Sequence, residues 1–358
     1  AVAVIQELRS RGTDVDIRWI GSHAGVEREI AESQGIPFQA IQTGKLRRYV
    51  SPRTVIDAFR VPVGITQAWG HIRRFQPHVI YSTGGAVSVP TVIAGSRRAP
   101  ILTHEQTAQI GIANRISARF ADVFAVTFHD TATLAQQIHK QVVITGNPVR
   151  TSLTGGTKEG GYAHFGFSPE LPVLYVTGGA RGASPINTRL EPVLARLLAT
   201  MQIVHQVGPA SANDDAARLR ALRATWPEET QRRYVVEEFV GSEIADLYAI
   251  TDLVLGRAGA GTVTELSFMG FPSVLIPLPG TWGDEQRKNA KILTGVGAAV
   301  TLEQEEATPE RLAQTLESLI GDPARLQSMS DAARTRSQPD AASLLVDQLL
   351  QLAATARR

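Results

Sequence analysis

One stretch of the sequence, residues 252–290, constrains the fold more than any other part of the chain. Its apolar run at residues 253–255 predicts a buried strand, and three glycines then precede a helical pattern that opens at Thr262. A second apolar run at residues 273–277 leads through a Pro/Gly loop to another helical pattern near Asp284. Two such strand–turn–helix units direct unpaired N–H groups toward one crevice. The stretch therefore predicts either an anion-binding site or an ordinary βαβ unit with tight glycine turns.

Polar residues at the start of these two helical patterns favour a nucleotide ligand. Glu265 lies one turn into the first pattern, where a carboxylate accepts hydrogen bonds from sugar hydroxyls in nucleotide-binding βαβ units. Glu285 and Gln286 open the second pattern and could address further hydroxyls. These three residues are candidate ligands for one sugar-containing molecule.

Composition excludes several classes of protein and site. The chain has 358 residues, which favours two domains, and its 43% hydrophobic and 20% charged residues are typical of a globular protein. No run of about 18 apolar residues predicts a spanning helix. The absence of cysteine excludes disulfides and thiolate metal sites. A net charge of +2 is too balanced to predict a nucleic-acid partner.

Short apolar runs alternate with helical patterns along the whole chain, which predicts parallel sheets covered by helices on both faces. The predicted strands are residues 15–20, 79–82, 101–103, 123–126, 142–144, 173–176, 203–207, 234–236, 253–255, 274–276 and 298–300. So many strands exceed a usual single sheet, and the glycine-rich stretch Thr154–Tyr162 offers a place to divide them. We predict an α/β chain of two doubly wound, Rossmann-like domains that face a cleft.

The first residues carry an expectation of their own. Residues 1–11 have a helical pattern closed by Gly12, and no strand precedes it. Because a doubly wound domain begins with a strand, we expect about one strand and one loop to be missing ahead of Ala1.

Glycine pairs and polar clusters follow several predicted strands. Gly84–Gly85 and Gly178–Gly179 stand between a strand and a helix, where open α/β sheets bind ligands, although tight turns alone explain them as well. The segment THEQTAQIGIAN at residues 103–114 gathers polar side chains at another strand end. His104 and Glu105 could serve as general base and orienter, or could fix the loop by hydrogen bonds.

A basic, partly apolar stretch at residues 45–74 is the other unusual segment. Such a stretch suits an anionic membrane surface, and a solvated helix with a buried seam is the alternative. The candidate membrane contacts are Arg47, Arg48, Arg53, Phe59 and Trp69. No zinc-ligand spacing, nucleophile elbow or phosphate-binding P-loop pattern occurs, so no metal site is predicted.

Taken in order, these segments resemble the MurG family of UDP-GlcNAc transferases. The resemblance rests on TGGAVSVP, HEQTAQIGIAN, TGNPVR, VTGGARGASPIN, EEFVGSEIADLY, RAGAGTVTEL and DEQRKNA, at residues 83–90, 104–114, 145–150, 176–187, 237–248, 257–266 and 284–290. It implies the GT-B fold, with an acceptor and membrane domain at residues 1–149 plus 339–358 and a UDP-sugar donor domain at residues 150–338. It also implies inverting transfer of N-acetylglucosamine from UDP-GlcNAc to undecaprenyl-pyrophosphoryl-MurNAc-pentapeptide (lipid I), giving lipid II for peptidoglycan synthesis.

The resemblance also implies a set of site residues. The donor site would comprise Arg150, Gly179, Ala180, Val240, Ala260, Gly261, Thr262, Val263, Thr264, Glu265, Glu285 and Gln286. The acceptor side would comprise Gly84, Gly85, Glu105, Thr107 and Asn114. The expected partners are UDP-GlcNAc, a polyprenyl-pyrophosphate acceptor and the anionic cytoplasmic face of the bacterial membrane, with no metal, cofactor or nucleic acid.

The chain departs from the family pattern in ways that keep alternatives open. The family's first glycine loop and its proposed base histidine would precede Ala1, which leaves Glu105 and His104 as the candidate bases within the chain. Ala86, Thr107 and Ala180 replace an aromatic residue, an asparagine and a serine. Besides a transferase, an isomerase resembling UDP-GlcNAc 2-epimerase and a non-catalytic UDP-sugar or lipid-binding homologue therefore remain possible functions.

Overall fold

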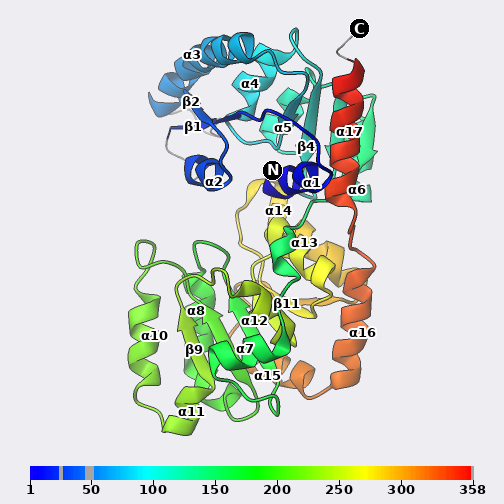
Figure 1. Ribbon diagram of the computed structural model, residues 1–358. Helices are drawn as coiled ribbons and strands as arrows, with labels where there is room; N and C mark the ends of the chain where they lie inside the picture. Colours follow the sequence, from blue (N-terminus) through cyan, green and yellow to red (C-terminus); the bar gives the residue numbers. More distant parts are fainter. Residues whose placement is uncertain (24–26, 45–51, 356–358) are drawn as a thin grey trace. The chain divides into compact units, whose positions relative to one another are not determined.

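The computed structural model describes residues 1–23, 27–44 and 52–355, without the side chains of residues 52–59 and Trp282 (Figure 1). Contacts divide the chain into two compact units, the first formed by Ala1–Pro148 with Gln338–Arg358 and the second by Val149–Ser337. Each unit is built on parallel strands that alternate with helices. The prediction of two doubly wound α/β domains is therefore confirmed.

The second unit contains one parallel sheet of six strands in the order β12-β11-β10-β7-β8-β9. Its strands are β7 (Val173–Thr177), β8 (Gln202–Gln206), β9 (Tyr234–Glu237), β10 (Leu253–Gly256), β11 (Ser273–Leu275) and β12 (Ala299–Thr301). Its helices are α7 (Lys158–Phe165), α8 (Ser184–Leu190), α9 (Leu194–Leu197), α10 (Asp215–Arg223), α11 (Glu228–Arg232), α12 (Ile244–Ile250), α13 (Ala260–Met269), α14 (Glu285–Thr294), α15 (Pro309–Ile320) and α16 (Pro323–Arg334), with short 3₁₀ turns η1 (Thr151–Leu153), η2 (Glu191–Val193) and η3 (Trp282–Asp284).

Alternation along the central strand β7 separates a core face from a site face. Leu174 and Val176 are fully buried and pack in a cluster with apolar residues of α8, α9, α10, α15 and α16. Tyr175, between them, points to the opposite face, where its ring lies 6.2 Å from that of Tyr248 in α12. Successive side chains of a strand point to opposite faces. The same strand therefore fills the core and supplies the floor of the site described below.

The first unit contains a four-stranded parallel sheet in the order β3-β4-β5-β6 and a separate parallel pair, β1-β2, among the residues described. Its strands are β1 (Trp19–Ser22), β2 (Phe38–Ile41), β3 (Ile80–Ser82), β4 (Ile101–Glu105), β5 (Val123–Val126) and β6 (Val142–Ile144). Its helices are α1 (Val2–Ser10), α2 (Glu27–Ser33), α3 (Pro52–Phe75), α4 (Ser88–Gly95), α5 (Ile112–Ser117), α6 (His129–Gln136) and α17 (Ala341–Thr355).

The C-terminal helix α17 returns to the first unit and lies beside α1 (Figure 1). Leu345 and Val346 are fully buried against Val4 and Leu8 of α1 and against β4 and β5. The Arg11 guanidinium, just after α1, reaches Asp347 at 2.5 Å. Because these contacts join residues that are far apart in the sequence, they close the unit around a common core.

Three local features differ from the sequence-based expectations. The strand predicted at residues 15–20 starts only at Trp19, whose N–H bonds the Pro37 carbonyl, because β2 pairs with Trp19–Ser22. The strand β2 was not predicted, since its FQAI sequence is only half-buried and lacks an apolar run. The stretch Thr154–Tyr162 lies inside the second unit and enters helix α7, whose N-cap Thr157 accepts a hydrogen bond from the Gly160 N–H.

The turn between β7 and α8 depends on a close approach of two backbones. Gly182 has φ +71°, and a Cβ added there would lie 2.0 Å from the Val207 carbonyl oxygen. Gly208, opposite it, has φ +97°. Only glycine combines this conformation with this proximity. Glycine is therefore required at both positions of this close approach.

We expect Gly182→Ala to lower the free energy of unfolding by more than the roughly 1–2 kcal/mol that a left-handed conformation costs a residue with a Cβ. The excess arises because the methyl group must displace the end of β8. Gly179→Ala is the matched control, since its φ is +78° but no atom lies within 4 Å of its added Cβ. Denaturant titration of both variants measures the difference, and equal losses would contradict the steric argument.

Candidate functional site

A cavity of about 520 Å³ opens at the carboxyl ends of the second unit's strands. Its walls come from the segment before η1, from β7 and the turn after it, from the end of β8, from the β9–α12 loop and from α12 and α13. The lining residues are Arg150, Ser152, Tyr175, Thr177, Gly179, Ala180, Gln206, Phe239, Val240, Gly241, Ser242, Ile244, Tyr248, Val254, Gly261, Thr262, Glu265, Leu266 and Phe271. Ligands of open α/β sheets bind at this edge.

The cavity gathers many of the donor-site residues inferred from the sequence. Those in its lining are Arg150, Gly179, Ala180, Val240, Gly261, Thr262 and Glu265. The lining does not include Ala260, Val263, Thr264, Glu285 or Gln286. Val263 is fully buried within the unit, so its side chain serves packing and not ligand contact.

Glu265 is a carboxylate held inside an aromatic wall of the cavity. Its Oε2 atom accepts a hydrogen bond from the Tyr248 hydroxyl at 2.8 Å. Burial raises the pKa of the Glu265 carboxyl, while the hydrogen bond from Tyr248 and the charge of Arg150 oppose this rise. A carboxylate has about four acceptor positions. With one donor from the described residues, Glu265 keeps acceptor positions for hydroxyl groups of a ligand.

Gln206 fixes the polar groups of the cavity floor. Its Oε1 atom accepts hydrogen bonds from the Tyr175 hydroxyl at 3.2 Å and the Val240 N–H at 3.0 Å. Its NH₂ group donates to the Gly179 carbonyl at 3.0 Å. The Val240 N–H is thus already paired with Gln206. Among the described residues the Val240 carbonyl has no such partner, so it can accept a hydrogen bond from a ligand.

The start of α13 presents backbone donors to the same cavity. Its N-cap is Gly259, and no side chain caps the helix there. Gly261 and Thr262, in the first turn, line the cavity together with the cation Arg150. N–H groups in a first helical turn have no partner within the helix and favour anions. The arrangement suits a phosphorylated ligand whose hydroxyls reach Glu265.

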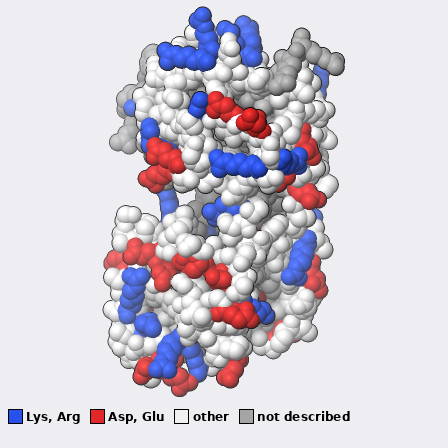
Figure 2. Space-filling view, in the orientation of Figure 1, with Lys and Arg blue, Asp and Glu red and all other residues white. Residues whose placement is uncertain are grey.

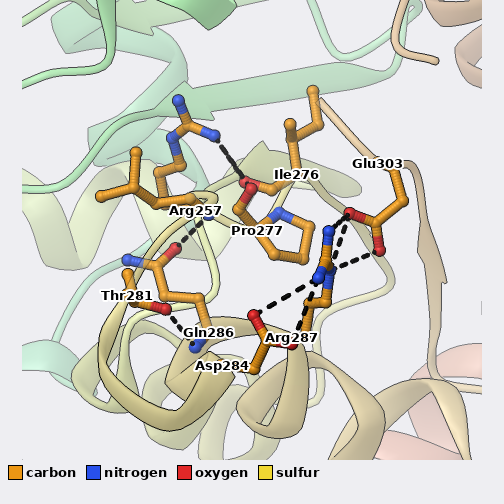
Figure 3. Close-up of polar contacts among 9 residues, drawn as sticks. Arg257, Ile276, Pro277, Thr281, Asp284, Gln286, Arg287 and Glu303 are labelled. Atoms are coloured by element: carbon orange, nitrogen blue, oxygen red, sulfur yellow. Dashed lines mark hydrogen bonds and ion pairs between the residues drawn. The ribbon is translucent and has the colours of Figure 1, made fainter. Parts of the chain in front are cut away.

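Gln286, which does not line the cavity, ties two turns of the second unit together (Figure 3). Its Oε1 atom accepts the Leu278 N–H at 2.9 Å and the Ala258 N–H at 3.3 Å. The Arg257 guanidinium reinforces the same connection by donating to the Ile276 carbonyl at 2.9 Å. Since its oxygen is occupied by backbone groups, the NH₂ group is the part of Gln286 that remains to meet a ligand.

The segment before α14 holds an unusual backbone conformation. Asp284 has φ +59°, which residues with a Cβ rarely adopt. Arg287 lies between the carboxylates of Asp284 and Glu303, at 3.2 Å and 2.9 Å (Figure 3). These ion pairs hold Asp284 in place, and Glu285 and Gln286 follow it at the start of the helix.

In the first unit, Glu105 fastens the loop after β4. Its Oε1 atom accepts the Thr107 N–H and hydroxyl at 3.0 Å each. Its Oε2 atom accepts the Gly111 N–H and the Asn114 NH₂ group at 2.9 Å each. The Asn114 amide also lies against Gly84, where an added Cβ would be 2.9 Å away. The structure thus brings together Gly84, Glu105, Thr107 and Asn114, which were predicted for the acceptor side, with Gly85 next to Gly84 in the chain.

His104 is fully buried beneath this loop. Its Nδ1 atom lies 3.3 Å from the Tyr81 hydroxyl, and its Nε2 atom lies 3.5 Å from the Thr127 hydroxyl. Burial lowers the pKa of His104 to about 3, which keeps the imidazole neutral. These contacts, and the four donors around Glu105, support the loop-fixing interpretation of both residues over the acid–base interpretation.

Helix α3 has both a buried apolar seam and an exposed aromatic and cationic surface, the two features considered for the basic stretch. Ala68 and Ile72 are buried in the seam against α4, whereas Trp69 is 40% exposed. The guanidinium groups of Arg73 and Arg98 lie 5.2 Å and 5.8 Å from the center of the Trp69 ring. Arg47 and Arg48 lie outside the described residues, as do the side chains of Arg53 and Phe59.

Elsewhere the described surface carries both signs of charge. On the face drawn in Figure 2, Lys and Arg side chains lie among Asp and Glu side chains in both units. In the described part of the chain no group of three or more His, Asp or Glu residues could hold a metal ion. None of the described helices has the length and apolar character needed to span a membrane.

Sequence reasoning missed several residues that line the cavity. Phe239 and Tyr248 belong to the quoted segment at residues 237–248, yet only Val240 was selected from it. Phe239 is 61% exposed, an unusual position for a large apolar side chain at a strand end. The available signal was an aromatic residue directly before the Val–Gly pair that follows a predicted strand. The sequence offered no comparable signal for Gln206.

Comparison with known families identifies both units. Residues 1–126 match the model of the glycosyltransferase family 28 N-terminal domain, and residues 173–345 match that of the glycosyltransferase family 28 C-terminal domain. A Bacillus cereus protein named UDP-N-acetylglucosamine–N-acetylmuramyl-(pentapeptide) pyrophosphoryl-undecaprenol N-acetylglucosamine transferase 2 is 38% identical, over 89% of this chain and 86% of that protein. A Desulforudis audaxviator transferase of the same name, without the numeral, is 33% identical over 100% of this chain and 96% of that protein.

Solved structures agree with this result. The crystal structure of Acinetobacter baumannii MurG superimposes with a TM-score of 0.73 and 28% identity, covering 98% of this chain and 94% of that chain. A putative UDP-N-acetylglucosamine 2-epimerase from Listeria monocytogenes has a TM-score of 0.70 at 13% identity, over 96% and 90% of the two chains. The second likeness shows a common fold only.

We expect Glu105→Gln to destabilise the first unit, because an NH₂ group would replace one of two oxygens that each face two donors. An unsatisfied buried donor costs about 1–3 kcal/mol. Thermal unfolding followed by circular dichroism should show a lower Tm. The matched control is Glu170→Gln, since Glu170 is an exposed carboxylate in the second unit. An unchanged Tm for Glu105→Gln would mean that the carboxylate does not fasten the loop.

Proposed function

The chain is a hexosyltransferase of glycosyltransferase family 28, and from this membership we propose that it transfers N-acetylglucosamine from UDP-GlcNAc to undecaprenyl-pyrophosphoryl-MurNAc-pentapeptide. The observation that carries the proposal is a polar cavity in the family's C-terminal domain with Glu265 in its wall. Relatives that are 31–38% identical bear the name of this transferase. The likeness to an epimerase extends to the fold alone, at 13% identity.

The donor nucleotide fits the cavity by its polar groups. Glu265 accepts hydrogen bonds from the ribose hydroxyls, since it keeps acceptor positions beside its contact with Tyr248. The Val240 carbonyl accepts the N3–H group of uracil, because its own N–H is paired with Gln206. Phe239, exposed at the rim, covers the base. The ribose hydroxyls and the uracil N3–H thereby each meet a hydrogen-bond acceptor.

The diphosphate lies at the first turn of α13 and near Arg150. The N–H groups of Gly261 and Thr262, which meet no acceptor among the described residues, supply donors, and the guanidinium supplies charge. The turn at Gly179 and Ala180 lines the same side, and Ala180 offers only its backbone there. The Gln286 NH₂ group and Glu285 hold hydroxyls of the sugar, which extends beyond the cavity lining.

The reaction exchanges one bond at the sugar's anomeric carbon. The acceptor's 4-hydroxyl oxygen forms a bond to that carbon while the bond to the diphosphate oxygen of UDP breaks, with inversion. The hydroxyl proton passes to a base, and UDP leaves with its charge held by the donors at α13. Catalysis of this kind rests on stabilising the charge that develops on the leaving group.

The acceptor is a lipid-linked sugar, so we place the chain at the cytoplasmic face of the bacterial membrane. The loop held by Glu105, together with Gly84, Gly85 and Asn114, forms the acceptor side. Trp69, with Arg73 and Arg98 stacked around it, provides an aromatic and cationic surface on the same unit. Such a surface suits the interface of an anionic bilayer.

The test is acceptor-dependent release of UDP. The protein is incubated with UDP-GlcNAc, with and without a lipid I analogue, and the products are separated by chromatography. Release of UDP and glycosylation of the acceptor only when both are present supports the transferase. Isomerisation of the sugar without acceptor, or binding without turnover, would contradict it and favour the isomerase or the non-catalytic homologue.

We predict that Glu265→Ala weakens binding of UDP by roughly 10–150-fold, because a hydrogen bond to a charged group contributes about 1.5–3 kcal/mol. Isothermal titration calorimetry measures the affinity directly. Glu170→Ala removes an equivalent charge from an exposed position outside the cavity lining and should leave the affinity unchanged. Unaltered affinity in Glu265→Ala would remove Glu265 from the nucleotide site.

We predict that the double variant Arg73→Glu/Arg98→Glu detaches the protein from anionic vesicles. Each basic residue near such a surface contributes about 1 kcal/mol, so removing two lowers partitioning by about 30-fold before added repulsion. Flotation with phosphatidylglycerol vesicles measures the fraction of protein that partitions onto the membrane. The control Arg325→Glu/Arg336→Glu changes the net charge equally at exposed positions of the second unit. Equal partitioning of the two variants would show that α3 is a solvated face.

A further inference from the structure

We propose that Tyr248 is a positioning residue for donor recognition: its hydroxyl orients the Glu265 carboxylate for the ribose. The inference rests on the proposed function, because it concerns the same nucleotide site. It adds a residue from a different helix, α12, to the determinants of donor affinity.

The geometry gives the Tyr248 hydroxyl one clear partner. It donates to Glu265 Oε2 at 2.8 Å, across the gap between α12 and α13. Tyr248 is 9% exposed and lines the cavity beside Glu265. A hydrogen bond to a charged acceptor is stronger than one between neutral groups. The contact therefore favours one orientation of the carboxylate, and its other oxygen, Oε1, has no hydrogen bond from the described residues and can accept ligand hydroxyls.

The ring of Tyr248 is held independently of its hydroxyl. It meets Phe271 edge-on with ring centers 5.2 Å apart and lies 6.2 Å from the ring of Tyr175. Aromatic pairs at these separations contribute to packing by their shape and quadrupole. Phenylalanine at position 248 would keep these contacts and lose only the hydrogen bond. The hydroxyl can thus be tested without removing the wall of the cavity.

The hydroxyl also affects the charge of Glu265. The titratable groups that face Glu265 are Tyr248 from α12, Arg150 from the segment before η1 and Tyr175 from β7. Burial raises the pKa of Glu265, and Tyr248 and Arg150 lower it. Burial also raises the pKa of Tyr248, so its hydroxyl remains a donor at neutral pH. Removing this donor raises the pKa of Glu265 further, and the ionised form that accepts ribose hydroxyls is then lost at a higher pH.

The experiment compares UDP with 2′,3′-dideoxy-UDP by calorimetry from pH 5.5 to pH 8.5, in the wild-type protein and in Tyr248→Phe. We expect Tyr248→Phe to bind UDP roughly tenfold more weakly at neutral pH. The acid limb of its pH profile should lie at higher pH than in the wild type. The dideoxy ligand lacks the ribose hydroxyls but keeps the phosphates that titrate in this range. Its affinity and its pH profile should therefore be nearly the same in the two proteins.

A matched variant separates positioning from general loss of stability. Tyr234 of β9 is fully buried and its hydroxyl contacts His205 Nδ1 at 2.9 Å, outside the cavity lining. Tyr234→Phe therefore loses a buried hydroxyl of similar kind. We expect it to lower the Tm while leaving the pH profile of UDP binding in place.

The outcomes separate failure of the inference from failure of the proposed function. If the wild-type protein does not bind UDP, the proposed function fails and the inference fails with it. If the wild type binds UDP but Tyr248→Phe has the same affinity and pH profile, the inference alone is overturned. Equal loss of UDP and dideoxy-UDP would also overturn it, because the hydroxyl would then support the cavity as a whole.

Discussion

The second unit's site depends on the hydrogen bonds of one side chain, the carboxamide of Gln206. Its oxygen takes the Tyr175 hydroxyl and the Val240 N–H, and its NH₂ group meets the Gly179 carbonyl. One residue at the end of β8 thus connects the strand β7, the turn that follows it and the loop after β9. Buried polar groups at strand ends need partners, and here satisfying them also fixes the positions of the three cavity walls.

The close packing of strand ends also explains the positions of the glycine turns. Parallel strands bring their carboxyl ends to one edge, so the turns that follow must pass close to one another. Gly182 and Gly208 permit this approach, with added Cβ atoms that would lie 2.0 Å and 2.5 Å from carbonyl oxygens of the opposite turn. The close turns leave the first residues of α13 and the end of β7 beside a common space. The cavity therefore follows from the sheet geometry together with the β9–α12 loop that lines it.

Periodicity and glycine placement were enough to predict the two doubly wound units and the position of Glu265 one turn into α13. Both signals are local, since a strand, a positive φ and a helix start depend on neighbouring residues. The roles of Tyr248 and Gln206 were not predictable, because each depends on a partner 17 or more residues away that only the fold brings near. The strand β2 was missed for a related reason, since its half-buried FQAI sequence depends on pairing with β1.

Glu105 and Glu265 show how surroundings separate two carboxylates with similar positions in the sequence pattern. Each lies near a strand end followed by a helix, and each was a candidate ligand. Glu105 accepts hydrogen bonds from the N–H groups of Thr107, Gly111 and Asn114, and the Thr107 hydroxyl lies 3.0 Å from its Oε1 atom, so most acceptor positions of this carboxylate are occupied. Glu265 receives one from the described residues and faces a cavity. A saturated carboxylate stabilises the protein, whereas an unsaturated one in a buried wall is costly until a ligand supplies donors. That difference, more than residue type or motif, underlies our proposal that the second unit's carboxylate binds the ligand and the first unit's carboxylate supports its loop.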